Sequence, residues 1–145
     1  MKIIYLDIDG VLNSEPTHAD AKKLNKAKVD LLYQLVSETS AKIVITSSWR
    51  FLRSIEEMKE QFNLSGYRGE VPIIGTTEKV QEVSRGKAIK KFRKSHPELD
   101  IKSYVILDDR HWDELGPNQI KHLVKVNGKK GLTSADIIIA KHILE

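Results

Sequence analysis

Two aspartates separated by one residue follow the first apolar segment of the chain. Asp7 and Asp9 come directly after segment 2–6, and Gly10 follows them. Ligands of an open α/β sheet bind at the carboxyl ends of its strands. Two acids in this place predict a nucleophile or metal ligand beside a second acid or base. Gly10 permits a turn at this point. The alternative is a strand end that carries two solvated acids.

Three further polar groups could take part in the same chemistry. Thr46-Ser47-Ser48 ends the apolar segment that begins at residue 41, Ser84-Arg85-Gly86-Lys87 opens a helical pattern, and Asp108-Asp109 ends the apolar segment from residue 104. Hydroxyl groups, cations and paired carboxylates thus follow apolar segments or open a helix, which are positions where an open α/β sheet binds its ligands.

The order of these four groups resembles the four motifs of the haloacid dehalogenase (HAD) superfamily of phosphotransferases. A receiver domain contains the same residue types, but its acid pair comes first, so the order argues against it. The resemblance implies hydrolysis of phosphomonoesters. In this pattern Asp7 attacks phosphorus and forms an aspartyl-phosphate, whereas Asp9 protonates the leaving oxygen and then activates water.

The resemblance also implies a magnesium ion. Asp7 and Asp108 would coordinate Mg²⁺ directly, Asp9 would contribute its backbone carbonyl, and Asp109 would act directly or through water. Mg²⁺ prefers oxygen ligands, and a cation is needed because the nucleophile and the phosphate are both anions. The alternative for the Asp108-Asp109 pair is a turn that begins with two acids.

The remaining site residues are a cation and a hydroxyl. Lys87 is expected to neutralise the phosphate, with a surface lysine of a basic helix as the alternative. Thr46 and Ser47 compete as the hydroxyl donor. Ser47 is slightly favoured because it lies two residues before Trp49, where the narrower resemblance described next places the hydroxyl. We expect four further residues to contact the substrate: Arg50, Arg85, Gly10 and Ser48.

A narrower resemblance points to the HAD domains of Swiss-army-knife RNA repair proteins. It rests on five short segments, at 9–13, 47–50, 74–77, 85–89 and 131–133. In that set the third motif often reads Arg-Gly-Glu-Glu-Ile, so Lys87 stands where an acid is common. The similarity favours nucleotides or nucleic-acid terminal phosphates as substrates. The alternatives are a small-metabolite phosphatase and a non-catalytic HAD-like domain that binds phosphate or protein.

Strand and helix patterns alternate along the chain. They predict a Rossmann-like, three-layer α/β sandwich around a mostly parallel sheet. Strands are expected near 2–8, 41–47, 71–75, 103–108 and 122–126, and helices near 25–38, 50–63, 86–95 and 133–144, with a short helix near 111–115. Thr133 or Ser134 should cap the helix at 133–144, and His96-Pro97 should end the helix at 86–95. Segments 13–25 and 76–84 are too short for a folded cap, which predicts a single capless domain over 1–145.

The composition excludes some classes of protein. The 145 residues contain no cysteine, which rules out disulfides and thiol catalysis. No apolar run is long enough for a membrane span, and the first residues do not resemble a signal peptide, so we expect a cytoplasmic protein that does not bind membranes. The first interpretation of the net charge of +4 is that basic helix faces are solvated. The alternative is a positive electrostatic field that attracts phosphorylated or polyanionic substrates. The oligomeric state is left open.

Overall fold

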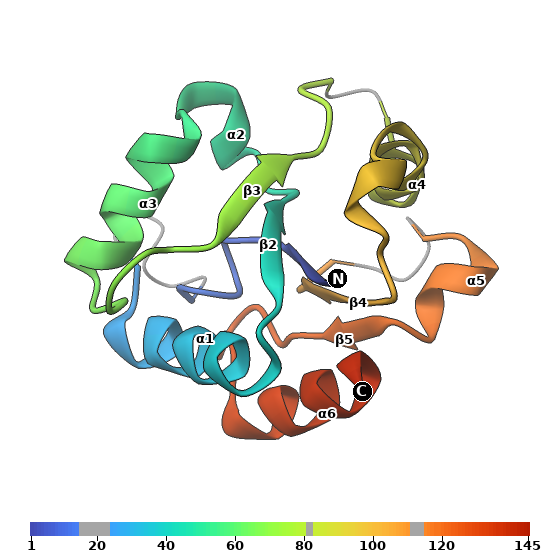
Figure 1. Cartoon of the computed structure of the whole chain (residues 1–145). Helices are drawn as coiled ribbons and strands as arrows, with labels where there is room; N and C mark the ends of the chain where they lie inside the picture. The colour runs from blue at the N-terminus through green and yellow to red at the C-terminus, as the bar shows by residue number, and fades with distance from the viewer. Residues whose placement is uncertain (15–23, 81–82, 111–114) are drawn as a thin grey trace.

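The computed structural model describes residues 1–14, 24–80, 83–110 and 115–145 (Figure 1). Within these residues, five strands form one parallel sheet with the order β3-β2-β1-β4-β5. The strands are β1 (Lys2–Leu6), β2 (Lys42–Ile45), β3 (Ile73–Thr76), β4 (Ser103–Asp108) and β5 (Leu123–Lys125). The helices are α1 (Lys26–Thr39), α2 (Trp49–Leu52), α3 (Ile55–Leu64), α4 (Arg85–Ser95), α5 (Pro117–Ile120) and α6 (Ser134–Leu144), with a 3₁₀ helix at Pro97–Leu99. The expected α/β fold is confirmed.

Both faces of the sheet are buried, because successive side chains of each strand point to opposite faces. Ile4 and Leu6 of β1 belong to the core cluster that contains the apolar faces of α1, α3 and α6. Ile3 and Tyr5 belong to a second cluster with Ile89 of α4. Figure 1 shows α4 on the opposite side of the sheet from α1 and α6. The sheet is therefore the middle layer of three.

One predicted helix is two helices in the structure. The expected helix at 50–63 is interrupted at Arg53, whose backbone is extended (φ −134°, ψ 140°). Ser54 then starts α3 with a capping box, in which its side chain accepts from the N–H of Glu57 and the Glu57 carboxylate accepts from the N–H of Ser54. This reciprocal pair satisfies two N–H groups that a new helix start leaves open, so the helical pattern restarts there.

The other helix ends agree with the sequence, and α5 was not expected. Thr133 caps α6, again with a capping box, to Asp136. Helix α4 ends at Ser95, shortly before Pro97. The short α5 begins at Pro117, a residue suited to a first helical position because it lacks an N–H. The expected short helix near 111–115 falls mainly on residues 111–114, which lie outside the described residues.

The capless domain was expected because segments 13–25 and 76–84 are short. Residues 15–23 and 81–82 of these segments lie outside the described residues, so the expectation of a capless domain stays a prediction. In the described part of the chain, no helix is long and apolar enough to cross a membrane.

Candidate active site at the carboxyl end of the sheet

Strand register places three polar residues side by side. Leu6, at the end of β1, pairs with Ile45 of β2 and with Leu107 of β4. The next residue of each strand therefore stands in one row, which consists of Asp7, Thr46 and Asp108. Because side chains alternate along a strand, this row continues the face that carries Tyr5, which is the face covered by α4.

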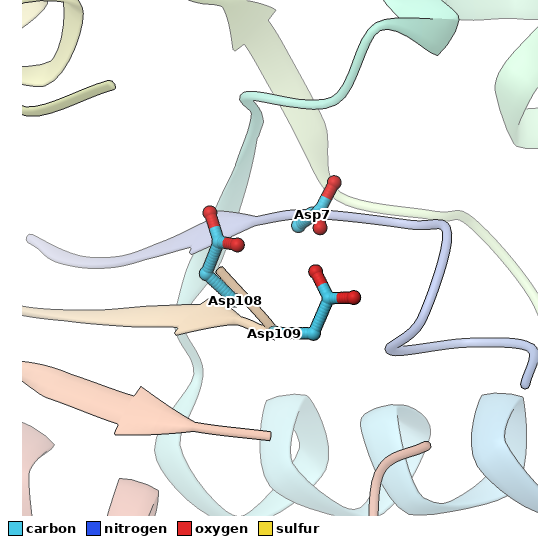
Figure 2. A group of neighbouring side chains, drawn as sticks. All are labelled: Asp7, Asp108 and Asp109. Atoms are coloured by element: carbon cyan, nitrogen blue, oxygen red, sulfur yellow. The ribbon is translucent and has the colours of Figure 1, made fainter. Parts of the chain in front are cut away.

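Three carboxylates converge at this row. Asp7, Asp108 and Asp109 each offer an oxygen, and these oxygens all lie within 4.8 Å of one another. Figure 2 shows them at the ends of β1 and β4. Asp7 and Asp108 are both only 4% exposed. Burial raises the pKa of Asp7 well above its ordinary value; the Arg85 charge opposes this shift, and the neighbouring acids add to it. Burial likewise raises the pKa of Asp108.

Arg85 supplies positive charge to this cluster. Its Nη1 lies 3.2 Å from Oδ1 of Asp7 and 3.0 Å from Oδ2 of Asp108. The same nitrogen donates a hydrogen bond to Oγ1 of Thr46 at 3.3 Å. Arg85 is the first residue of α4, and Ser84 caps the helix by accepting from the N–H of Lys87. This cap fixes where α4 begins and which side chain of its first turn faces the row.

Lys87 lies elsewhere, contrary to the expected arrangement. Its side chain is exposed and lines a separate groove with Lys90. Residues two apart on an α-helix are separated by about 160° around its axis, so Arg85 and Lys87 cannot both face the row. Of the two cations in the third motif, the structure brings Arg85 to Asp7.

Asp9 occupies a separate place beside the cluster. Its Oδ1 accepts hydrogen bonds from Nδ2 of Asn13 at 2.9 Å and from Nε1 of Trp49 at 3.1 Å. The turn that follows β1 is closed by the N–H groups of Val11 and Leu12, which both donate to the carbonyl of Ile8. Asp9 is thus held by one residue of its own turn and by one residue of α2, which orients a carboxylate next to the row.

Gly10 is required by geometry at this turn. Its φ is +85°, in the left-handed region that glycine tolerates best. A Cβ at this position would come within 2.1 Å of Oδ2 of Asp109. The backbone N–H of Gly10 donates to Oδ1 of Asn13. Gly10 thus lets the Asp109 carboxylate approach the backbone, whereas its expected contact with substrate stays a prediction.

A cleft of about 230 Å³ opens beside Arg85. Its polar lining includes Thr46, Ser48, Thr77 and two further arginines, Arg50 and Arg110, and its apolar lining includes Phe51, Val80 and Val83. The hydroxyl of Thr77 is buried and has no hydrogen-bond partner among the described residues. The cleft therefore combines positive charge with hydroxyl groups, a lining suited to an anionic, oxygen-rich ligand.

The two hydroxyls considered for the second motif differ in their surroundings. Thr46 lines the cleft, and its oxygen contacts Arg85. Ser47 is 1% exposed, and its oxygen accepts from the N–H of Trp49 at 3.2 Å. The structure thus brings the Thr46 hydroxyl to the acid cluster and engages the Ser47 hydroxyl in the first turn of α2.

Arg50 is buried and joins two loops. Its Nη1 donates to the carbonyls of Thr46 and Ser47 at 2.6 and 2.7 Å, and its Nε donates to the carbonyl of Glu78 at 3.2 Å. Burial lowers its pKa. Because these donors are used by the backbone, the side chain fixes the ends of β2 and β3 relative to each other. Its expected contact with substrate stays a prediction, although it lines the cleft.

The acid cluster fits a hard divalent cation. Carboxylate oxygens are the ligands that Mg²⁺ and Ca²⁺ prefer. Burial raises the pKa values of Asp7 and Asp108 and makes their ionisation costly, and the neighbouring carboxylates add to this cost while Arg85 opposes it. A bound cation would remove that cost.

The sequence as a whole matches one family model. The model is described as the HAD domain in Swiss Army Knife RNA repair proteins, and it matches residues 3–137. The chain belongs to this family. The HAD resemblance is thereby confirmed over a range that contains the complete row and the acid cluster. Neither a curated protein nor a solved structure matches the chain.

Three features of this HAD domain were missed by sequence reasoning. The indole of Trp49 and the amide of Asn13 hold Asp9, although both residues occur in segments similar to the RNA repair set. The buried hydroxyl of Thr77, which has no hydrogen-bond partner in the part of the chain that the structure describes, lies in another of these segments. A contact between Trp49 and Asp9 joins residues far apart in the chain, and no local pattern signals it.

Proposed function

We propose that this HAD domain is a Mg²⁺-dependent phosphatase that hydrolyses phosphomonoesters through an aspartyl-phosphate on Asp7. The observation that carries the proposal is the contact of one Arg85 nitrogen with both Asp7 and Asp108, beside a cleft rich in arginine and hydroxyl groups. A nucleophilic carboxylate, a cation and an anion-binding cleft meet there. Membership of the HAD family suggests a phosphatase-like function.

The first step forms the covalent intermediate. A carboxylate oxygen of Asp7 attacks phosphorus, and the bond between phosphorus and the ester oxygen breaks. Asp9 gives its proton to the departing oxygen, because an alkoxide is a poor leaving group. The hydrogen bonds from Asn13 and Trp49 hold one oxygen of Asp9 and leave the other for this transfer.

The second step releases the product. Asp9, now a carboxylate, removes a proton from water, and the water oxygen attacks the phosphorus of the aspartyl-phosphate. The bond between phosphorus and Asp7 breaks, which restores the Asp7 carboxylate and yields inorganic phosphate. Arg85 neutralises charge on the phosphoryl oxygens in both steps, and we assign this role to it in place of Lys87. Thr46 donates a hydrogen bond to the same oxygens.

The metal would be held by Asp7, Asp108 and Asp109, the three carboxylates that converge at the row. When bound, Mg²⁺ would neutralise charge on the phosphoryl group and on the nucleophile. The backbone carbonyl of Asp9 stays a predicted fourth protein ligand.

We further propose phosphate-terminated nucleic acid as the substrate class, with small phosphorylated metabolites as the alternative. Three arginines line the cleft beside Asp7, counting Arg85. The family is named for domains of RNA repair proteins. A polyanionic substrate would use the positive surface beyond Asp7, whereas a small monophosphate would use mainly Arg85 and the metal.

The decisive experiment is hydrolysis of a generic aryl phosphate with Mg²⁺ or with EDTA. The wild-type protein should be active only with Mg²⁺, and Asp7→Asn should lose several orders of magnitude in kcat because the covalent path is lost. Asp100→Asn is a matched control, because Asp100 is exposed and lies outside the site.

Activity that survives chelation, or that survives in Asp7→Asn, would falsify the mechanism. Inactivity of the wild-type protein on aryl phosphates and phosphorylated oligonucleotides would favour a non-catalytic binding domain.

A further inference from the structure

A second cavity lies on the other side of the first turn of α4. It has a volume of about 490 Å³ and runs between α4 and the segment that leads into α5. We call it the α4–α5 groove; its lining is Ser84, Gly86, Lys87, Lys90, Arg93, Tyr104, Leu115, Gly116, Pro117, Asn118 and Gln119. None of these residues belongs to the row or to the acid cluster, so the groove is distinct from the cleft.

The described residues of the α4–α5 groove carry an excess of positive charge. Lys87, Lys90 and Arg93 line it, no acidic residue of the described ranges does, and none of the three cations forms an ion pair within those ranges. A neighbour on the same helix shows the contrast, because Lys91 pairs with Glu78 at 2.6 Å. Cations that project into a cavity without a counter-charge create a field that attracts anions.

The walls of the groove are held in place. The side-chain amide of Gln119 donates to the carbonyl of Gly86 at 2.8 Å, which ties α5 to the start of α4. The Arg93 guanidinium lies over the ring of Tyr104, 4.6 Å from its centroid. Tyr104 is itself stacked on His122 at 3.9 Å. Aromatic packing therefore fixes Tyr104 in the groove, and the exposed residue Asn118 lines the opposite, α5 wall.

We propose that the α4–α5 groove binds the phosphodiester backbone of a single nucleic-acid strand whose terminal phosphate lies at Asp7. This inference rests on the proposed function and assigns the groove as its second binding site. Arg85 lines the cleft, and its two neighbours Ser84 and Gly86 line the groove. One strand can therefore cross the first turn of α4 from one cavity into the other.

The length of the groove suits several phosphates. From residue 85 to residue 93 the helix rises about 12 Å, at 1.5 Å per residue. A stacked strand rises about 3.4 Å per nucleotide along its axis, so this length spans about three nucleotide steps. Lys87, Lys90 and Arg93 are spaced three residues apart, about 4.5 Å along the helix axis, so their charges are distributed over the same length. An acidic peptide is less well suited, because it has no group that would place its other end at Asp7.

The test is fluorescence anisotropy with a labelled single-stranded oligonucleotide that has no terminal phosphate, measured in EDTA. This probe reports the groove without turnover. Lys90→Glu should weaken binding about tenfold and reduce the slope of log affinity against log salt by about one. Asn118→Asp, which adds a negative charge on the opposite wall, should act in the same direction. Lys94→Glu is the matched control: Lys94 is exposed on the same helix but does not line the groove, so it should keep nearly wild-type affinity.

The outcomes separate this inference from the proposed function. Equal affinity in Lys90→Glu, Asn118→Asp and Lys94→Glu would overturn the groove assignment even if the protein hydrolyses aryl phosphates. Weaker binding in the first two variants alone would support it even if no hydrolysis is found. An acidic peptide that displaces the oligonucleotide at equal total charge would point to a protein partner and would also overturn the assignment.

Discussion

At the scale of single residues, one nitrogen atom of Arg85 defines the site. It contacts oxygens of Asp7, Asp108 and Thr46, so it links the carboxyl ends of β1, β4 and β2. A lysine at the same position would offer a point charge without the planar fork that spreads the charge of arginine over several donors. The choice between Arg85 and Lys87 depends on where α4 begins, because each residue rotates the side-chain direction by about 100°.

The hydroxyl of the second motif can be tested by mutation. Thr46→Val removes the oxygen that contacts Arg85 and keeps the shape of the side chain. We expect kcat to fall roughly 10²–10³-fold, the usual cost of losing one donor to a transition state. Ser47→Ala should cost less, because its oxygen bonds the N–H of Trp49. Steady-state kinetics on an aryl phosphate decides between them, and a larger loss in Ser47→Ala would assign the role to Ser47.

Gly10 should couple the turn after β1 to metal binding. Gly10→Ala would place a methyl group against the Asp109 carboxylate, so we expect weaker Mg²⁺ binding by calorimetry as well as lower stability. Gly69→Ala is the matched control, because Gly69 also has a positive φ (76°) but has no atom within 4 Å of the added Cβ. Equal Mg²⁺ affinity in the two variants would show that the collision with Asp109 is relieved without cost.

The polar residues of the site could be predicted in part. Asp7, Asp108 and Asp109 follow apolar segments, and the resemblance to HAD proteins implied that they share a metal; in the structure their oxygens do lie close together. The partners of Asp9 could not be found in this way. Trp49 reaches Asp9 because α2 starts directly after β2, next to β1 in the sheet, and this depends on strand order.

At the scale of elements, Arg50 connects the ends of β2 and β3. Arg50→Met keeps the length of the side chain and removes its donors to three carbonyls. Buried acceptors that lose their partner cost about 1–3 kcal/mol. We expect a lower midpoint of thermal unfolding and a lower kcat, since Thr46 lies in the released loop. Arg68→Met, at an exposed arginine that lies over Tyr33, is the control for loss of charge, and an unchanged midpoint in Arg50→Met would contradict the role.

The elements themselves were largely predictable, because the strands are apolar segments between helical patterns. The break between α2 and α3 was missed because Arg53-Ser54 lies inside a pattern that continues at helical spacing. The capping box of Ser54 and Glu57 is a local signal that could have revealed it. Pro117 was a similar signal for α5. The strand order β3-β2-β1-β4-β5 cannot be predicted from any local segment, because it arises from pairing between strands that are distant in the sequence.

At the scale of the whole molecule, the acid cluster should lower stability at neutral pH. The pKa values of Asp7 and Asp108 are raised on folding, so their contribution is fully present below the ordinary value of 3.8 and is lost as pH rises through the raised values. Asp108→Asn should therefore raise the melting temperature in EDTA at pH 7 by about 2–4 °C, which is roughly 1 kcal/mol in a domain of this size.

Calorimetry at two pH values checks this prediction. The gain in Asp108→Asn should shrink as the pH falls toward 4, because the raised pKa values of the wild-type carboxyls favour their protonated form at acidic pH. Added Mg²⁺ should stabilise the wild-type protein, because a ligand of the folded state shifts the equilibrium, and it should stabilise the variant less. A variant that melts below the wild-type protein at pH 7 in EDTA would show that Asp108 is stabilised by Arg85 more than it is destabilised by burial.

The position of β1 has a consequence for synthesis of the chain. Among the five strands, β1 is made before the others but lies in the centre of the sheet, where Leu6 pairs with both Ile45 and Leu107. Until β4 has been made, one apolar edge of β1 stays open, and open edges template aggregation. Pairing between such distant segments also slows folding. A nascent chain that stops before Ser103 lacks two of the three clustered carboxylates, so the ability to hold a metal is acquired only after Asp108 and Asp109 have left the ribosome.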